Sequence, residues 1–179
     1  MEHVPKKFFL TKGAGTGQTP LLSLEAALQE AKISPYNLVK VSSIIPPNCQ
    51  EISKEEGLNQ LHKGEIIYTV LSENRTKKHN QKISCALGIA RPKEKSLQGY
   101  ICEHHDKNST RIETGKFAEK CAISMLGNVA GLNIQNIDTV KKKPEIQNII
   151  SDSKNVSIEA NLTTNAKYLT VIAAVVFIL

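Results

Sequence analysis

Segments with the composition of β-strands dominate this chain, and only two segments have the periodicity of helices. The strand-like segments are rich in β-branched and aliphatic residues, and turn-forming or charged residues separate them. They span residues 7–11, 37–45, 65–71, 82–90, 97–104, 156–162 and 168–179, while helices are expected over 19–31 and 113–129. Strands in uninterrupted runs argue against the regular alternation of a parallel nucleotide-binding sheet. The order of elements therefore predicts an α+β layered fold.

The length of the chain fits one domain. A chain of 179 residues can bury a sizeable core, so we expect residues 1–179 to fold as a single unit. Hydrophobic residues make up 40% of the chain, but aromatic residues only 4%, and tryptophan is absent. The core is therefore expected to be aliphatic.

The basic balance of the chain suggests a nucleic-acid partner at first. The formal net charge is +6 and the isoelectric point is about 9.1. The lysines and arginines are scattered, however, with short clusters only at 77–78 and 141–143. No aromatic residues alternate with them in the way that would stack bases. We therefore expect a solvated basic surface and no nucleic-acid partner.

Signals for metals, disulfides and membranes are weak. The four cysteines show no CxxC spacing and no paired histidines, which predicts neither a zinc site nor a disulfide framework. Cys85, Cys102 and Cys121 have apolar neighbours and are expected to be buried. The N-terminus lacks the long apolar run of a signal peptide, and the apolar run 171–179 is far shorter than the roughly 20 residues of a membrane helix. The sequence predicts a cytoplasmic protein without a membrane partner.

Local signals place several element boundaries. Thr19 is a suitable N-cap and Pro20 suits the first position of a helix. The glycine-rich stretch 13–17 matches neither a dinucleotide fingerprint nor a phosphate loop, and we interpret it as a flexible turn. The charged stretch 72–81 is expected to be a hairpin loop. The residues from Lys141 onward are expected to form an exposed connection.

The most informative segment is residues 37–47, Asn-Leu-Val-Lys-Val-Ser-Ser-Ile-Ile-Pro-Pro. Because the two prolines cannot continue a strand ladder, Ser42-Ser43 is expected at a strand end or at the turn leaving it. A serine pair alone is common at such a place. The whole segment, however, closely resembles the self-processing site of the pyruvoyl-dependent arginine decarboxylases. Similar stretches are found at 9–11, 19–28, 89–103 and 169–177.

The resemblance implies a specific chemistry for Ser43. Decarboxylation of an α-amino acid leaves electrons on the α-carbon and requires an electron sink, for which pyridoxal phosphate is the usual cofactor. In this family a pyruvoyl group serves instead and forms a Schiff base with the substrate, so we expect no pyridoxal phosphate and no metal. The Ser43 hydroxyl would attack the carbonyl of Ser42, and Ser43 would become the pyruvoyl group. The products would be a β chain, residues 1–42, and an α chain, residues 43–179.

The resemblance also implies roles for residues elsewhere in the chain. Asn37 would assist the cleavage, and Glu103 would protonate the α-carbon after carbon dioxide has left. Glu25 would pair with the guanidinium of the substrate. The remaining residues expected to line the substrate pocket are Leu21, Leu28, Ser34, Tyr36 and Ile44.

Each of these polar residues also has an ordinary interpretation. Asn37 suits the cap of a turn before a strand, and Glu25 suits an exposed helix position. Glu103 follows an apolar strand, where partial burial would raise its pKa and permit proton donation, but a glutamate there is often only solvated. His104 and His105 are neighbours in a strand, so they point to opposite faces and cannot chelate one ion together.

The family implies a four-layer αββα sandwich that assembles as a homotrimer with active sites between subunits. Its members convert L-arginine to agmatine and carbon dioxide. Two alternatives stay open. The chain could decarboxylate another basic amino acid, because Glu25 stands where similar proteins carry Asp and Tyr36 is bulky. It could also be a non-catalytic relative that acts as a binding or regulatory subunit. The chain departs from the family pattern after Pro47, at 54–56 and at 141–153.

Overall fold

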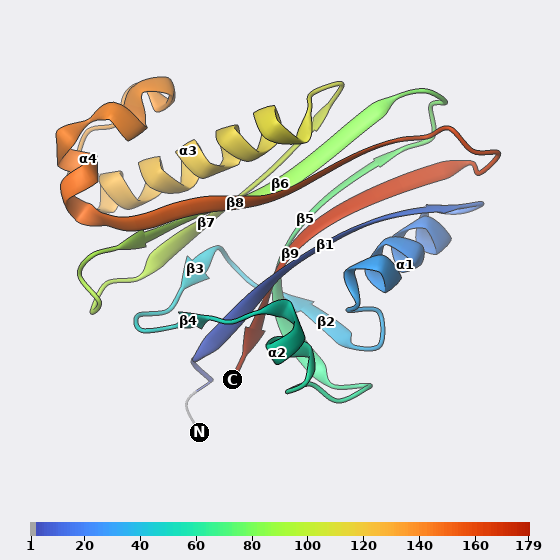
Figure 1. Cartoon of the computed structure of the whole chain (residues 1–179), viewed down its shortest axis with the longest axis horizontal. Helices are drawn as coiled ribbons and strands as arrows, with labels where there is room; N and C mark the ends of the chain where they lie inside the picture. Colours follow the sequence, from blue (N-terminus) through green and yellow to red (C-terminus); the bar gives the residue numbers. More distant parts are fainter. Residues whose placement is uncertain (1–2) are drawn as a thin grey trace.

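Two β-sheets form the centre of the molecule in the computed structural model, which describes residues 3–179. One sheet has five strands in the order β2-β5-β9-β1-β4, and the other has four in the order β3-β7-β6-β8 (Figure 1). The strands are β1 Lys7–Gly17, β2 Asn37–Lys40, β3 Ile44–Ile45, β4 Gln50–Glu51, β5 Ile66–Thr76, β6 Lys82–Pro92, β7 Gly99–Lys107, β8 Ile150–Asn161 and β9 Tyr168–Ile178. The prediction of a mixed α+β fold is confirmed.

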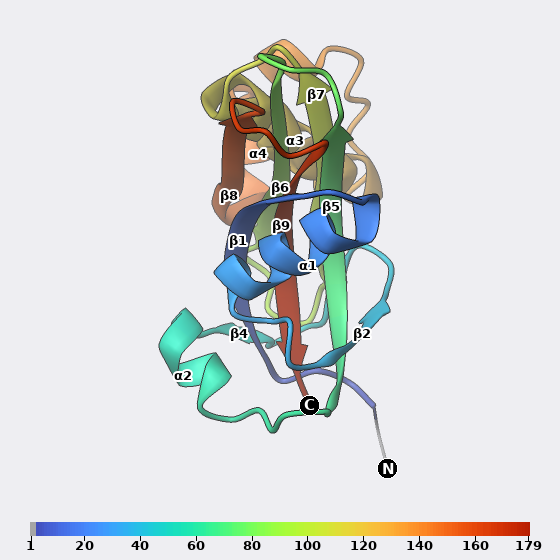
Figure 2. The same ribbon diagram turned by 90° about the vertical axis from the view of Figure 1, so that its right-hand side faces the viewer.

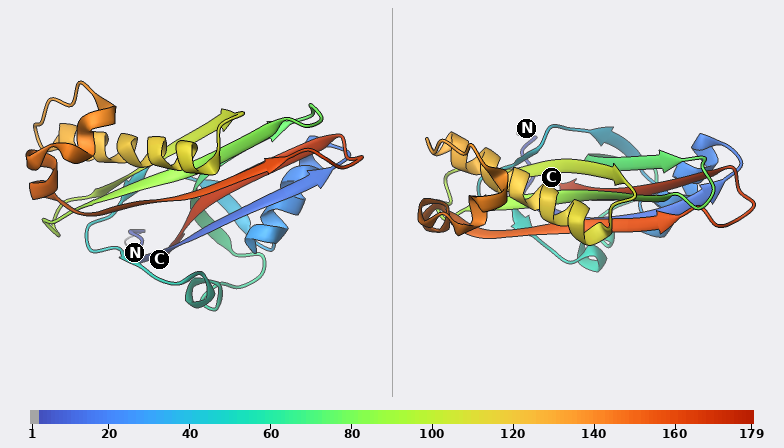
Figure 3. Two further views of the ribbon diagram at one scale, coloured as in Figure 1. Left: turned by 45° about the horizontal axis from the view of Figure 1, so that its top comes forward. Right: turned by 90° about the horizontal axis from the view of Figure 1, so that it is seen from above.

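Helices pack on the outer faces of these sheets. They are α1 Pro20–Ala31, α2 Lys54–Leu58, α3 Arg111–Val129 and α4 Pro144–Ile149, with the 3₁₀ helix η1 Ile137–Lys142. Helix α1 contacts β1 and β9, whereas α3 contacts β6, β7 and β8. These two helices lie on opposite sides of the strands (Figures 2 and 3). Within residues 3–179, no helix combines the length and the apolar character that crossing a membrane requires.

Apolar side chains fill the space on both sides of each sheet. The cluster between the two sheets includes the fully buried Val70, Leu87 and Ile101. A second cluster lies between α1 and the five-stranded sheet, and a third lies between α3 and the four-stranded sheet. Valine, isoleucine, leucine and alanine make up most of all three, in agreement with the aliphatic core expected from the composition.

The glycine-rich stretch 13–17 is part of strand β1, so the prediction of a flexible turn is wrong. Gly13, Gly15 and Gly17 lie directly beneath α1, where the helix backbone comes very close to the strand. A Cβ atom on Gly15 would stand 2.2 Å from the backbone nitrogen of Ala27. The glycines are therefore required by close packing and not by a turn. The helix start is as predicted, with the Thr19 side chain capping Leu22 N and Pro20 in the first turn.

Replacing Gly15 with alanine is expected to destabilise the fold by about 1–3 kcal/mol or more, because the added methyl must push α1 away from β1. Thr16→Ala is the matched control, since Thr16 is the exposed neighbour on the same strand. Chemical denaturation of both variants measures the difference. Equal stability of the two variants would contradict the close contact between α1 and β1.

Two segments that were expected to be loops are ordered elements. Strand β5 extends to Thr76, so the connection between β5 and β6 is shorter than the predicted loop 72–81. The stretch after Asn136 forms η1 and α4, which bury Val140 and Ile146 against α3. Lys141 binds the buried Glu119 of α3 at 2.5 Å, and Ser153 and Asn155 donate to the same carboxylate. These segments were predicted to be loops because they contain many charged residues, and the sequence does not show that they contact the rest of the fold.

The four cysteines are free thiols. Cys85 is buried, as predicted, but Cys102 and Cys121 are only partly buried, and Cys49 is buried although no such prediction was made. Burial raises the pKa of the Cys49 thiol to about 11, so this thiol is un-ionised at neutral pH.

Candidate active site

Ser42 and Ser43 lie where the chain crosses from one sheet to the other. The single strand expected over 37–45 is in fact two strands, with β2 at the edge of the five-stranded sheet and β3 at the edge of the four-stranded sheet. Val41 N donates to Thr69 O at 2.9 Å, which holds the chain against β5 up to the residue before Ser42. Ser42 is exposed and Ser43 is partly buried. The prediction that the serine pair follows a strand is confirmed.

Two backbone hydrogen bonds fix the carbonyl groups on either side of Ser43. Ile44 N donates to Ser42 O at 3.0 Å, and Ile101 N donates to Ser43 O at 2.9 Å. The first bond closes a three-residue turn centred on Ser43. The second bond attaches Ser43 to strand β7. The serine pair is thus held firmly on its C-terminal side.

Strand β7 places Glu103 on the same face as Ile101. Because side chains alternate along a strand, Ile101 and Glu103 both point toward the other sheet, roughly 7 Å apart along the chain. Although Glu103 as a whole is exposed, neighbouring atoms remove part of the water around its carboxyl and raise its pKa. The nearby charges of Lys40 and His105 lower that pKa by a smaller amount. The upward shift expected from the sequence is therefore present.

Lys40 is a residue near Glu103 that the sequence reasoning did not assign to the site. It is the last residue of β2, two positions before Ser42, and its charge acts on the Glu103 carboxyl. In the sequence, Lys40 could have been noticed only as a basic side chain within the informative segment 37–47. Its charge acts on Glu103 because β2 and β7 come together across the two sheets, and the sequence alone does not show that approach.

The two adjacent histidines point to different surroundings, as predicted. The ring of His104 stacks on Phe117 of α3 with a centroid separation of 4.3 Å, while His105 lies on the face of Glu103. Among residues 3–179, no group of three or more histidine, cysteine, aspartate or glutamate side chains is arranged to hold a metal ion.

Asn37 lies at the far end of β2 from the serine pair. Its side-chain nitrogen donates to Gly64 O at 2.7 Å, and its backbone nitrogen donates to Glu65 O at 2.8 Å. Six residues of largely extended chain, or roughly 20 Å, separate it from Ser43. Within one chain, Asn37 thus tethers the start of β2 to the loop before β5, which matches its interpretation as a cap.

The predicted substrate-binding residues lie mainly around α1. Leu28 is buried under the helix, and Tyr36 packs at the border of the same cluster. Ser34 N donates to Leu28 O at 3.2 Å, so it closes the end of the helix. Leu21 is 73% exposed, and Glu25 is partly exposed, with its carboxylate accepting a hydrogen bond from Gln29.

A single chain does not bring Glu25 together with Ser43. Helix α1 covers the outer face of the five-stranded sheet, whereas Ser43 joins the two sheets at their edge and Glu103 faces the space between them. Of the expected pocket residues, only Ile44 is next to Ser43, and its side chain is 39% exposed. The predicted residues therefore form two separate groups.

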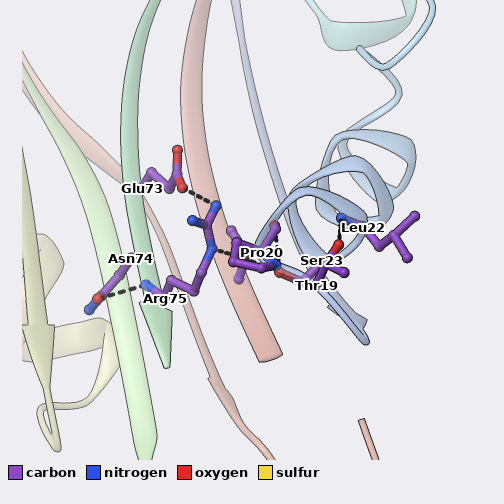
Figure 4. A network of polar contacts seen from close by, with 8 residues as sticks. Thr19, Pro20, Leu22, Ser23, Glu73, Asn74 and Arg75 are labelled. Atoms are coloured by element: carbon purple, nitrogen blue, oxygen red, sulfur yellow. Dashed lines mark hydrogen bonds and ion pairs between the residues drawn. The ribbon is translucent and has the colours of Figure 1, made fainter. Parts of the chain in front are cut away.

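A buried polar network holds the N-terminal end of α1 on the sheet (Figure 4). The hydroxyls of Ser23 and Thr170 are 2.8 Å apart and both residues are fully buried. Arg75 Nε donates to Thr170 Oγ1 at 2.9 Å, and its Nη2 pairs with Glu73 at 2.6 Å. Because buried hydroxyls are costly to leave unpaired, this chain of bonds fixes the position of α1, and with it Glu25.

Comparison with known proteins decides the family. The family model of pyruvoyl-dependent arginine decarboxylase (PvlArgDC) matches residues 7–179. A pyruvoyl-dependent arginine decarboxylase of Thermoplasma volcanium is 42% identical over 176 residues, which cover 98% of this chain and 97% of the relative. The chain belongs to the pyruvoyl-dependent arginine decarboxylase family. Pyruvoyl-dependent arginine decarboxylase 2 of Methanosarcina acetivorans is 38% identical, covering 98% of this chain and 97% of the relative. A probable pyruvoyl-dependent arginine decarboxylase of Chlorobaculum tepidum is 40% identical, covering 93% and 91%.

The residues matched by the model of the pyruvoyl-dependent arginine decarboxylase family include the two segments in which the sequence differs from the family pattern. Residues 54–56 lie in α2, and residues 141–153 lie in η1, α4 and the start of β8, all inside the matched range. Helices η1 and α4 pack on α3, α2 contacts β1, and β8 lies at the opposite edge of the four-stranded sheet from β3, so these departures lie outside the segment that holds the serine pair.

The chain also has a cleft beside β3, which is separate from the active site predicted from the sequence. It has a volume of about 750 Å³ and is lined in part by Ile45, Arg91 and Asp152. None of the predicted site residues lines it. Arg91 binds Asp152 through two hydrogen bonds of 2.8 and 3.0 Å, so these charges are already paired with each other. Neither Arg91 nor Asp152 is therefore free to pair with a charged substrate in this cleft.

Proposed function

We propose that this chain is a pyruvoyl-dependent decarboxylase that converts L-arginine to agmatine and carbon dioxide. The observation that carries the proposal is the hydrogen bond from Ile101 N to Ser43 O, because Glu103 lies two residues after Ile101 on the same face of β7. The nearness of Glu103 to the residue that the family converts into its cofactor supports its proposed role as the proton donor. Membership of the family supports the reaction type and the substrate.

Self-cleavage begins with attack of Ser43 Oγ on the carbonyl carbon of Ser42. The Ser42–Ser43 C–N bond breaks, an ester forms, and the Ser43 nitrogen takes up the hydroxyl proton as a free amine. Removal of the Ser43 α-proton then expels the Ser42 carboxylate and leaves dehydroalanine. Water replaces its nitrogen, which departs as ammonia, and a pyruvoyl group is left at residue 43. The β chain ends at Ser42 and the α chain begins at residue 43.

The residues present suit a pyruvoyl group at this position. The Ser42 carbonyl accepts a hydrogen bond, as required for its activation, and β7 anchors the other side of Ser43. The pyruvoyl carbonyl supplies the electron sink for the electrons left by carbon dioxide. Glu103 delivers a proton to the α-carbon, and its raised pKa keeps more of it protonated than an ordinary glutamate.

We propose further that the chain adopts the family's four-layer αββα sandwich and forms trimers with active sites between subunits. The placement of α1 and α3 on outer faces supports the layered architecture. The separation of Glu25 from Ser43 within one chain supports a shared site, because a neighbouring subunit can supply α1. Exposed apolar side chains on α1 and around β2 and β3, namely Leu21, Leu22, Val39, Ile44 and Ile66, support a contact surface there.

Glu25 is the proposed partner of the arginine guanidinium. Replacing it with glutamine is expected to raise KM for arginine about 10- to 100-fold, because a charge-assisted hydrogen bond is lost. Self-cleavage should be unchanged, because Glu25 is proposed to bind the substrate and contributes no group to the reaction between Ser43 and Ser42. Steady-state kinetics and mass spectrometry measure the two effects. Glu25→Asp is the matched control and should keep most of the affinity, whereas an unchanged KM in Glu25→Gln would remove Glu25 from the pocket.

The substrate is tested by carbon dioxide release from arginine, lysine and ornithine. The proposal predicts that arginine is turned over with the highest kcat/KM. A higher kcat/KM for lysine or ornithine would favour the alternative of another basic amino acid. Absence of turnover with all three, in a chain that does not cleave itself, would favour a non-catalytic subunit.

A further inference from the structure

Helix α3 lies on the outer face of the four-stranded sheet, and its backbone comes very close to the sheet at Gly88 of β6 (Figure 1). A Cβ atom on Gly88 would overlap the backbone carbonyl of Ala118. Cys102 is the residue of β7 directly opposite Gly88 in the ladder, so its side chain stands beside this contact and on the same face. The Cys102 thiol is therefore directed at α3 where helix and sheet are in close contact.

The contact between His104 and Phe117 shows how β7 and α3 are aligned. Their rings stack with a centroid separation of 4.3 Å. Side chains two residues apart share a face of a strand, and side chains four residues apart share a face of a helix, so the next such pair is Cys102 with Cys121. The two thiols are hydrogen bonded to each other, and both cysteines are free and only partly buried. Two thiols from different elements thus face each other at the surface of the sheet.

We propose that Cys102 and Cys121 form a dithiol–disulfide site, which hydroperoxides oxidise and thiol reductants restore, and that its disulfide ties α3 to β7. The other two cysteines, Cys49 and Cys85, belong to the cluster between the sheets, on the opposite side of the four-stranded sheet from α3. They are therefore not placed to join either thiol of the pair. The inference does not depend on self-cleavage, because both cysteines lie within residues 43–179.

Cys121 is the thiol that reacts first. Burial raises the pKa of both thiols, and that of Cys102 reaches about 12, so oxidation is expected to be slow. The hydrogen bond between the thiols contributes to the rise at Cys102 but lowers the pKa of Cys121, which makes Cys121 the easier of the two to ionise.

The reaction takes two electrons from the two thiols. The Cys121 sulfur attacks one oxygen of the hydroperoxide, an S–O bond forms and the O–O bond breaks. The other oxygen takes up the thiol proton and leaves as water or an alcohol, so Cys121 becomes a sulfenic acid. The Cys102 sulfur then attacks the Cys121 sulfur, the S–S bond forms, and the sulfenic oxygen leaves as water with the proton of Cys102.

The test uses the purified full chain, with hydrogen peroxide as the oxidant. Peptide mapping without reductant is expected to show a link between Cys102 and Cys121. The number of thiols titrated under denaturing conditions should fall from four to two, since one disulfide consumes two thiols, and dithiothreitol should restore all four. Because the link closes a loop of about 20 residues, the thermal midpoint of unfolding should rise by about 5–10 °C.

Cys121→Ser removes one partner of the link, and Cys49→Ala is the matched control because Cys49 is buried between the sheets. Peroxide should form no link in Cys121→Ser and should not raise its thermal midpoint, whereas Cys49→Ala should still lose two thiols and gain stability. Four free thiols after prolonged treatment of the unmodified chain would overturn the proposal, as would a disulfide between any other pair or a link that leaves the thermal midpoint unchanged. These results are the same for a cleaved and an uncut chain, so they are independent of the proposed decarboxylase function.

Discussion

Replacing Ser43 with alanine is expected to leave one uncut chain of 19.7 kDa with no decarboxylase activity. Without the hydroxyl there is no nucleophile for the Ser42 carbonyl and no source of the pyruvoyl group. Both effects should be complete, because the same side chain supplies the cleavage step and the cofactor. Denaturing electrophoresis with intact-mass measurement, followed by an assay of carbon dioxide release from arginine, records both.

Ser42→Ala is the matched control for Ser43→Ala. Ser42 contributes its backbone carbonyl to the reaction, and its side chain is exposed, so the alanine variant should still cleave and still decarboxylate. Fragments from the Ser43→Ala chain with a break at the same bond would show that another group starts the reaction. The same circular dichroism spectrum for both variants would exclude a difference in folding.

Replacing Glu103 with glutamine is expected to leave self-cleavage unchanged but to reduce decarboxylation. The variant should cleave itself normally, since Ser43 and its hydrogen bonds are untouched, but kcat should fall about 10²- to 10⁴-fold through loss of the proton donor. Stopped assays of agmatine formation with the fully cleaved variant measure this loss. Undiminished turnover would exclude Glu103 from the reaction.

The pH dependence of kcat provides a second measure of Glu103. A proton donor acts only when protonated, so activity should fall as pH rises through the pKa of Glu103. Because partial desolvation raises that pKa, this fall should occur at a higher pH than for an ordinary glutamate. In Lys40→Gln it should move to still higher pH, because the Lys40 charge lowers the pKa. A profile that is identical in both chains would contradict the effect of the Lys40 charge on the pKa of Glu103.

The sequence predicts well the features that depend on neighbouring residues. Thr19 and Pro20 mark the start of α1 because capping is decided within one helical turn. The prolines after Ile45 show that the strand must end. Glu103 was assigned through the resemblance of residues 89–103 to the family, and the raised pKa expected from its partial burial is present, although β7 continues past it to Lys107.

Features that depend on distant contacts were missed or misread. The glycines of β1 resemble a turn, because nothing near them in the sequence shows that α1 will pack on the strand. Residues 37–45 have one continuous β pattern, yet the chain changes sheets at Ser42-Ser43. The hydrogen bond from Ile44 to Ser42 belongs to the backbone, so no side chain reveals it. The separation of Glu25 from Ser43 likewise depends on which face of the sheet α1 covers.

The most direct test of the account is the intact mass of the purified, unmodified chain under denaturing conditions. The account predicts two fragments that meet between Ser42 and Ser43, with the larger one blocked at its N-terminus by a pyruvoyl group. A single chain of 19.7 kDa after long incubation would contradict it.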